Sequence, residues 1–249
     1  MVCCVRMTGC SDAPLRSRRA GNLISLIILL ALPACFPAFA VTLVYTERSD
    51  PRQSDEHAVT HSFIIDPAPG GYAITVTSQR QGGLVVYQKL RTNEGFSVLE
   101  WWYLDEAKAT EFTAIREGSV IRFAGRRGTR SVSRTFAVDD SPWYQLFPHG
   151  LEQLVASGGQ GLRFWAVGAE GAGAMRIGAF RAIVGRLEQI EYGGTLVEAL
   201  HVRIRLAGPG SLLWSGDYWY RPHDGRNLVS SSDRGPGSHP IRIELSSER

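Results

Sequence analysis

Alternation of apolar and polar residues with a period of two recurs along most of the chain, and it limits the possible folds more than any other feature. Residues 59–65 (VTHSFII) and 72–77 (YAITVT) show it clearly. Successive side chains of a β-strand point to opposite faces, so this period is typical of strands with one buried face. Similar segments are residues 84–90, 96–103, 111–116, 119–125, 130–138, 162–167, 174–184, 196–206, 212–220 and 241–245. The pattern predicts about 11–13 strands.

Turn sequences, rather than linkers, separate these segments. Residues 67–71 (PAPGG) and Glu117-Gly118 are typical of hairpin turns, which join antiparallel strands. No Pro/Ser-rich boundary divides residues 41–249, and we expect a single domain there. A sheet of this length must curl to bury one face. The predicted fold class is therefore mainly β, with a large curled antiparallel sheet that forms an incomplete barrel.

Only residues 142–156 favour a helix. Ser141 is a good N-cap, and Pro142 suits the first helical position. The apolar residues that recur there at helical spacing are Trp143, Leu146, Phe147, Leu151, Leu154 and Val155. We expect Pro148 and Gly150 to kink or split the helix and to act as its hinge. The helix is predicted to pack on the concave side of the sheet, where it would cover part of the hollow.

The first forty residues have the three parts of a secretory signal peptide. Residues 16–19 contain three arginines, residues 23–32 are uncharged and largely apolar, and residues 38–40 (AFA) form a small-x-small cleavage site. The apolar run is about 10–14 residues long, too short to span a bilayer as a helix. We therefore expect residues 1–40 to be removed after export, so that residues 41–249 work in the periplasm.

All four cysteines lie within the first 35 residues. Residues 32–35 (LPAC) resemble the lipobox that precedes a lipidated cysteine, so an outer-membrane lipoprotein anchored at Cys35 is the alternative. The remaining chain has no disulfide and no cysteine metal site. Residues 1–40 also hold four arginines and one acid of the 27 basic and 24 acidic residues, which leaves 23 of each. This balance argues against a nucleic-acid partner.

Residues that could support catalysis or bind a metal do not converge in the sequence. His57 and His61 form an HxxxH motif, but residues four apart on a strand lie roughly 13 Å apart. The adjacent Asp139-Asp140 would point to opposite faces, and we do not expect this pair or Glu188 with Glu191 to act as an acid–base pair. No GxSxG motif is present. We therefore predict no metal, no cofactor and no enzymatic activity.

Aromatic residues are the most unusual feature of the remaining sequence. Four of the six tryptophans lie in residues 101–103 (WWY) and 214–220 (WSGDYWY). They would either fill a core or line an apolar cavity. In the second case the helix and neighbouring strands supply the binding side chains. The predicted ligand-binding residues are Trp143, Leu146, Phe147, Leu151, Leu154, Trp165, Trp214 and Tyr218.

A cluster of arginines marks one pair of predicted strands. Its members are Arg126, Arg127, Arg130 and Arg134. Charged side chains on an edge strand discourage edge-to-edge pairing, which is the simpler interpretation. The alternative is a peripheral contact with anionic headgroups at a membrane surface.

Two C-terminal segments resemble a known family. Residues 194–202 (GTLVEALHV) resemble the G-T-F-E-A-x-x-V strand entry of an uncharacterised group of bacterial periplasmic proteins, a domain of unknown function. Residues 219–225 (WYRPHDG), followed by a last strand at 241–245, resemble the aromatic YWY…DG hairpin of that group. The group is similar to the superfamily of the periplasmic lipoprotein carrier and the outer-membrane lipoprotein receptor. The resemblance implies an incomplete antiparallel barrel with an apolar cavity for acyl chains.

These observations predict an exported, non-enzymatic protein of the cell envelope that binds an apolar ligand between sheet and helix. The ligand would be an acyl chain, a lipid or a lipoprotein. The alternative is a structural or assembly factor that binds a protein partner and no ligand. A filled interior with an exposed apolar patch would favour this alternative. Carboxylates or histidines that converge in a cleft would favour an enzyme.

Overall fold

The computed structural model describes residues 40–48, 58–81, 83–170, 174–208, 214–232 and 240–249. The expected signal peptide and Cys35 lie outside these residues, as does all of the expected cleavage site except Ala40. Export and processing therefore stay predictions. Among the described residues, no helix is long and apolar enough to cross a bilayer.

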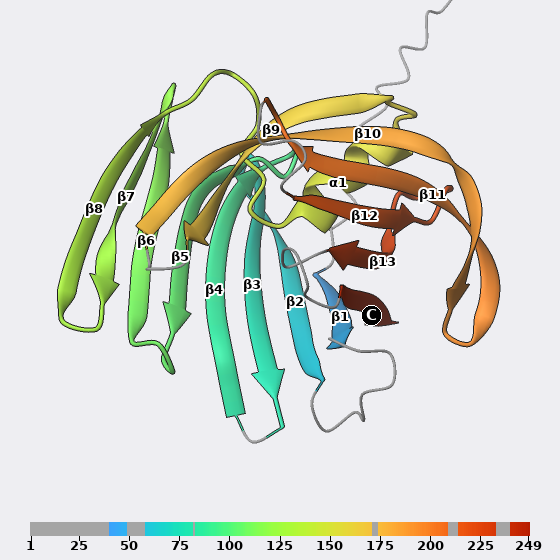
Figure 1. Cartoon of the computed structure of the whole chain (residues 1–249), viewed down its shortest axis with the longest axis horizontal. Coiled ribbons are helices and arrows are strands. Elements are labelled where there is room, and N and C mark those ends of the chain that lie inside the picture. Colours follow the sequence, from blue (N-terminus) through green and yellow to red (C-terminus); the bar gives the residue numbers. More distant parts are fainter. Residues whose placement is uncertain (1–39, 49–57, 82, 171–173, 209–213, 233–239) are drawn as a thin grey trace, which may run out of the picture. The chain divides into compact units, whose positions relative to one another are not determined.

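Fourteen strands of the described chain form one antiparallel sheet (Figure 1). The N-terminal strands are β1 (Val41–Arg48), β2 (Val59–Ala68), β3 (Gly71–Arg80), β4 (Gly83–Asn93), β5 (Val98–Asp105), β6 (Thr110–Glu117), β7 (Val120–Arg127) and β8 (Arg130–Ala137). The C-terminal strands are β9 (Gly161–Glu170), β10 (Ala174–Tyr192), β11 (Thr195–Leu206), β12 (Ser215–Tyr220), β13 (Asn227–Ser232) and β14 (Ile241–Glu248). The mainly β, antiparallel fold predicted from the alternation is confirmed.

The two ends of the described chain meet in the middle of the sheet. Strand β1 pairs with β14, and Thr42 and Arg249 exchange two backbone hydrogen bonds of 2.9 Å. From this centre the order runs through β2 to β8 on one side and through β13 to β9 on the other. The sheet curls, but its edge strands β8 and β9 do not pair (Figure 1). The predicted incomplete barrel is therefore confirmed.

The segment before the helix links the two halves of the curled sheet. The Trp143 carbonyl accepts a hydrogen bond from the Val98 N–H at 2.7 Å, at the start of β5. On its other side, the Trp165 N–H of β9 donates to the Pro142 carbonyl, and the Trp165 carbonyl accepts from the Tyr144 N–H. These bonds place Trp143, which is fully buried, between β5 and β9.

Helix α1 (Phe147–Ala156) is shorter than the predicted helix over 142–156. Ser141-Pro142 does not begin it, because the backbone of the next residues pairs with β5 and β9. Pro148 lies in the first turn, where its missing N–H costs no helical hydrogen bond, so it does not kink the helix. The Tyr144 ring lies 2.5 Å from the position that a Gly150 Cβ would occupy. Gly150 therefore allows close packing, and the predicted kink or split at these two residues is wrong, whereas their predicted role as a hinge stays a prediction.

The sequence pattern missed two strands and part of a third. Strand β1 was not predicted, and β13 (NLVSSS) has serines on both faces instead of an alternation. Strand β10 continues eight residues beyond the predicted end at Val184, through a bulge before Leu187. Strand β5 begins at Val98 because Phe96 has φ 59°, which breaks the extended conformation.

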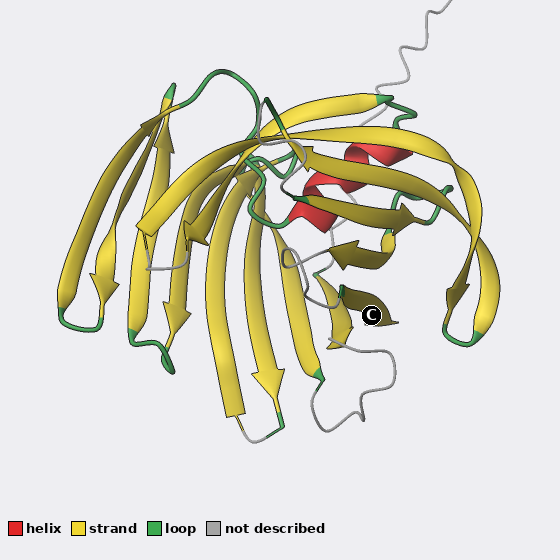
Figure 2. Ribbon diagram, in the orientation of Figure 1, coloured by secondary structure: helices red, strands yellow, loops and turns green. Residues whose placement is uncertain are grey.

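Two apolar clusters form the core. The larger is built from residues of β1–β7 and Trp143, with further members on β9, β11, β13 and β14, and the smaller joins α1 to β9–β12. Leu151 and Val155 on α1 pack there against Phe164, Val202 and Tyr220. Figure 2 shows the helix in red within the curve of the strands, and it contacts β12 and β13.

Candidate functional site

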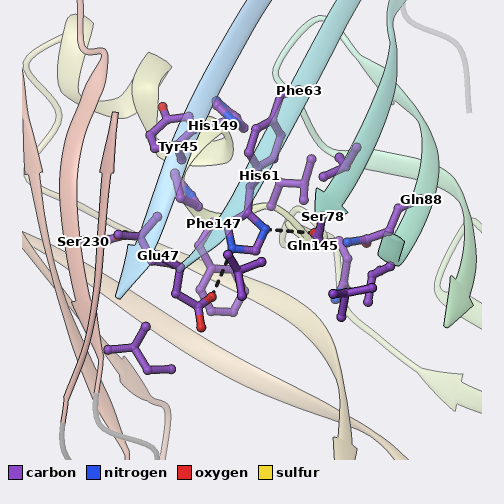
Figure 3. Close-up of a pocket in the computed structure, with 18 of the residues that line it drawn as sticks. Tyr45, Glu47, His61, Phe63, Ser78, Gln88, Gln145, Phe147, His149 and Ser230 are labelled. Carbon is purple, nitrogen blue, oxygen red and sulfur yellow. Dashed lines mark hydrogen bonds and ion pairs between the residues drawn. The ribbon is translucent and has the colours of Figure 1, made fainter. Parts of the chain in front are cut away.

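A pocket of about 480 Å³ lies inside the curled sheet, beside the N-terminal end of α1 (Figure 3). Its walls come from the inner faces of β1–β5 and β12–β14 and from the residues that lead into the helix. The lining residues are Tyr45, Glu47, Val59, His61, Phe63, Val76, Ser78, Arg80, Val85, Val86, Gln88, Tyr103, Gln145, Leu146, Phe147, Pro148, His149, Tyr218, Ser230, Ser232, Ile241 and Ile243. Its size is within the range of small-molecule sites, about 300–1,000 Å³.

Strand register brings distant residues together in this pocket. Tyr45 on β1 is opposite His61 on β2, His61 is opposite Ser78 on β3, and Ser78 is opposite Val86 on β4. Residues directly opposite one another in an antiparallel sheet share a face. The four side chains therefore form one row across the inner face, and all four line the pocket.

Three polar side chains form a hydrogen-bonded relay in the pocket wall. The Ser78 Oγ lies 2.8 Å from the His61 Nδ1, and the His61 Nε2 lies 3.0 Å from the Glu47 Oε2 (Figure 3). Ser78 is 5% exposed, and the His61 and Glu47 side chains are 19% and 15% exposed. The relay thus joins β1, β2 and β3 in a largely buried setting.

The rest of the pocket is mainly apolar. Phe63 and Val76 contribute from the sheet, Leu146 and Phe147 from the start of the helix, and Ile243 from β14. The Phe63 ring also packs edge-on against the ring of His149, with centroids 4.7 Å apart. The pocket therefore presents apolar surface next to the polar relay, which suits an amphipathic ligand.

A largely buried ion pair lies at the junction of α1 and the C-terminal strands. Arg226 donates from Nη1 to the Glu152 Oε2 at 2.8 Å and from Nε to the Glu248 Oε1 at 3.1 Å. The Glu152 Oε1 lies 3.1 Å from the His149 Nδ1. Burial opposes the charge of Arg226, but Glu152 and Glu248 outweigh it and raise the pKa of the guanidinium.

The pocket brings together three of the eight predicted ligand-binding residues, namely Leu146, Phe147 and Tyr218. The other five lie outside its lining: Trp143, Leu151, Leu154, Trp165 and Trp214. Trp143 and Leu151 are fully buried in the core, and Leu154 packs against the smaller cluster. Trp165 hydrogen-bonds Asp139 at 2.7 Å. The Trp214 ring lies 5.5 Å from that of Phe180.

One carboxylate of each acidic pair considered in the sequence, Asp139 and Glu188, has hydrogen-bond partners in the structure. Asp139 accepts hydrogen bonds from Trp165, the Ser141 N–H and Arg163, and the bond from Trp165 in particular lowers the pKa of its carboxyl. The Glu188 Oε2 accepts from the Trp219 Nε1 at 3.2 Å, which lowers the pKa of Glu188. His57 lies outside the described residues. Within those residues, no group of three or more His, Cys, Asp or Glu side chains is arranged to hold a metal.

The arginine cluster lies on β7 and on the edge strand β8, as a protected edge requires. Arg126 pairs with Glu111 at 3.1 Å, and Arg127 lies opposite Arg130 at the end of the hairpin. Its other predicted role, contact with anionic headgroups, stays a prediction.

The relay was missed in the sequence, although the hairpin turn contained a signal for it. His61 and Ser78 each lie eight positions from the two-residue turn Pro69-Gly70. A two-residue turn pairs positions at equal distances on either side. Glu47 has no such signal, because its strand enters through a longer connection.

Buried tyrosines predict a loss of stability at alkaline pH. Burial raises the pKa of Tyr45, Tyr218 and Tyr220 above the ordinary value of 10.0, and burial together with Asp105 raises that of Tyr103 to about 12. The fold holds these phenols neutral, whereas the unfolded chain ionises near pH 10. We expect the free energy of unfolding to be steady below about pH 9 and to fall between about pH 10 and 12. Urea unfolding at stepped pH measures it, and a value unchanged up to pH 11 would contradict the expectation.

Comparison with known proteins identifies the fold but no family. No protein-family model matches the chain, and no curated protein matches it. Among solved structures, it is similar to a β-barrel-like protein of the domain of unknown function DUF1849 from Brucella abortus. The two share 10% sequence identity with a TM-score of 0.51, and the match covers 84% of this chain and 97% of that one. The chain thus has a β-barrel-like fold seen in a domain of unknown function.

Proposed function

We propose that this protein is exported to the cell envelope and binds the acyl chain of a lipid or lipoprotein in the pocket beside α1. The observation that carries the proposal is the pocket itself. Its apolar lining residues, such as Phe63, Phe147 and Ile243, lie beside the polar relay. The tripartite N-terminus supports export. The resemblance of the C-terminal segments to the lipoprotein-carrier superfamily supports an acyl ligand.

Burial of the acyl chain would supply the driving force for such binding. Each CH₂ group transferred from water contributes roughly 0.8 kcal/mol, so about a dozen contribute close to 10 kcal/mol. Association costs about 4–15 kcal/mol in lost freedom and ordering. The gain from a long chain is therefore of the same order as the cost, and each CH₂ removed from the chain lowers it by roughly 0.8 kcal/mol.

A titration with a fluorescent fatty acid tests the proposal. Delipidated protein should bind it saturably with one site per chain. The affinity should increase with chain length between about eight and about sixteen carbons, because each added CH₂ contributes roughly 0.8 kcal/mol. Absence of saturable binding, with a pocket shown by crystallography to be filled by protein side chains, would contradict it.

Exposed apolar residues favour the alternative of a protein partner. Leu196 and Leu187, on the hairpin of β10 and β11, are 74% and 49% exposed. If this hairpin is the functional surface, replacing both by serine should abolish capture of an envelope partner while fatty-acid binding is unchanged. Capture that is unchanged in the double variant would contradict this role of the hairpin.

A further inference from the structure

We propose that Ser78, His61 and Glu47 form a nucleophilic site that hydrolyses an acyl ester bound in the pocket. The inference deepens the proposed function and rests on it, because the acyl chain in the pocket would present its ester to Ser78. It differs from the non-enzymatic role expected from the sequence. The carboxylate and the histidine converge with a serine only once the strands pair.

The distances of the relay match those of a serine activated by histidine. The Ser78 Oγ and the His61 Nδ1 are 2.8 Å apart, and the His61 Nε2 and the Glu47 Oε2 are 3.0 Å apart. Both lie within the range of about 2.6–3.2 Å required for a nucleophile and its base. Figure 3 shows the imidazole between the carboxylate and the hydroxyl, inside the pocket.

The carboxylate determines which nitrogen of His61 carries the proton. An ionised Glu47 can only accept hydrogen bonds, so the Nε2 of a neutral ring must donate to it. The Nδ1 is then the unprotonated nitrogen, and it accepts from the Ser78 hydroxyl. Serine proteases use the two nitrogens in the opposite order, but their roles are the same, a base for the hydroxyl and a donor to the carboxylate.

Proton transfer through His61 would balance both halves of the reaction. The Ser78 Oγ attacks the ester carbonyl carbon while its proton moves to the His61 Nδ1. The bond to the alcohol oxygen breaks, and that oxygen takes the proton. A water molecule then attacks the acyl carbon and gives a proton to Nδ1, and the Ser78 oxygen leaves and recovers it. The net reaction is ester plus water to acid plus alcohol.

Gln88 is placed to stabilise the oxyanion. It lies on β4, lines the pocket and extends toward Ser78 in Figure 3. Its Oε1 accepts a hydrogen bond from the Trp101 Nε1 at 2.9 Å. This bond fixes the amide and leaves its NH₂ group as the donor available to developing negative charge. Side-chain amides serve this role in other acyl-transfer sites.

A fluorophosphonate probe and a series of p-nitrophenyl esters test the site. We expect the probe to label Ser78 and the protein to hydrolyse long-chain esters faster than acetate. Ser78→Ala should abolish labelling and lower kcat/KM at least about 100-fold. The matched control is Ser62→Ala, because Ser62 lies next to His61 on β2, faces away from the pocket and is not part of its lining. It should stay within about threefold, a difference of less than 1 kcal/mol.

The role of Glu47 as a positioning residue has its own readout. Glu47→Gln should lower kcat at least about tenfold with KM nearly unchanged, and Glu47→Asp should recover part of the loss. A merely structural role would lower fatty-acid binding as well.

Fatty-acid titration of the same variants separates failure of this inference from failure of acyl binding. Ser78→Ala should bind a fatty acid as the unaltered protein does, which also shows that it folds. Binding without probe labelling at Ser78, or hydrolysis equal in Ser78→Ala, would overturn the hydrolytic site and leave acyl binding intact. Absence of binding in the unaltered protein would overturn the proposed function itself.

Discussion

Replacing Arg226 by methionine is expected to lower the free energy of unfolding by about 3–5 kcal/mol. The change keeps much of the apolar stem but removes the guanidinium that holds Glu152 on α1 and Glu248 on β14. Arg226 and Glu152 are 17% and 11% exposed, so the change would leave the Glu152 carboxylate in a largely buried site without its guanidinium partner. A buried charge left without its partner is costly because water cannot replace the lost ion pair.

Two further variants show whether the loss comes from the orphaned carboxylate. Adding Glu152→Gln to Arg226→Met should recover much of the stability, since the uncompensated charge is then gone. Arg122→Met is the control, because its pair with Glu117 is also 2.8 Å long but is 66% and 57% exposed. It should change stability by less than about 1 kcal/mol. Urea unfolding measures all three, and an Arg226→Met loss no larger than that of Arg122→Met would contradict this role.

The fold was predictable because its information is local. Alternation with a period of two marks each strand whose outer face is polar, and short turns imply antiparallel neighbours. Strand β13 was missed because Ser230 and Ser232 point into the pocket, so its inner positions are as polar as its outer ones. The start of the helix was misplaced for a tertiary reason. Trp143 uses its backbone to link β5 and β9, which no local pattern reveals.

The pocket was harder to predict than the fold, because it depends on register between strands. The tryptophans are the most unusual feature of the sequence, yet none of the six lines the pocket, since two are buried in the core and four are half-buried elsewhere. The residues that make the pocket distinctive are smaller and polar. Glu47, His61 and Ser78 come into contact only when β1, β2 and β3 pair. Of the residues grouped by helical spacing, Leu146 and Phe147 line the pocket, whereas Trp143, Leu151 and Leu154 do not.

Filling the pocket with an indole should abolish acyl binding. Val86 lies on the inner face of β4 opposite Ser78, so Val86→Trp would place a large side chain in the space that the ligand needs. We expect the affinity for a sixteen-carbon fatty acid to fall at least about 100-fold, or close to 2.7 kcal/mol. The added volume should cost less than about 3 kcal/mol of stability, because it enters a cavity instead of a packed core.

Val44→Trp is the matched control, since it makes the same change on the outer face of the same sheet. Val44 lies on β1 between the inward-facing Leu43 and Tyr45, and it is not part of the pocket lining. Fluorescent fatty-acid titration of the two variants beside the unaltered protein is the most direct measurement. The proposed site predicts that Val86→Trp loses binding and Val44→Trp keeps it. Equal affinities in all three proteins would contradict a ligand site in this pocket.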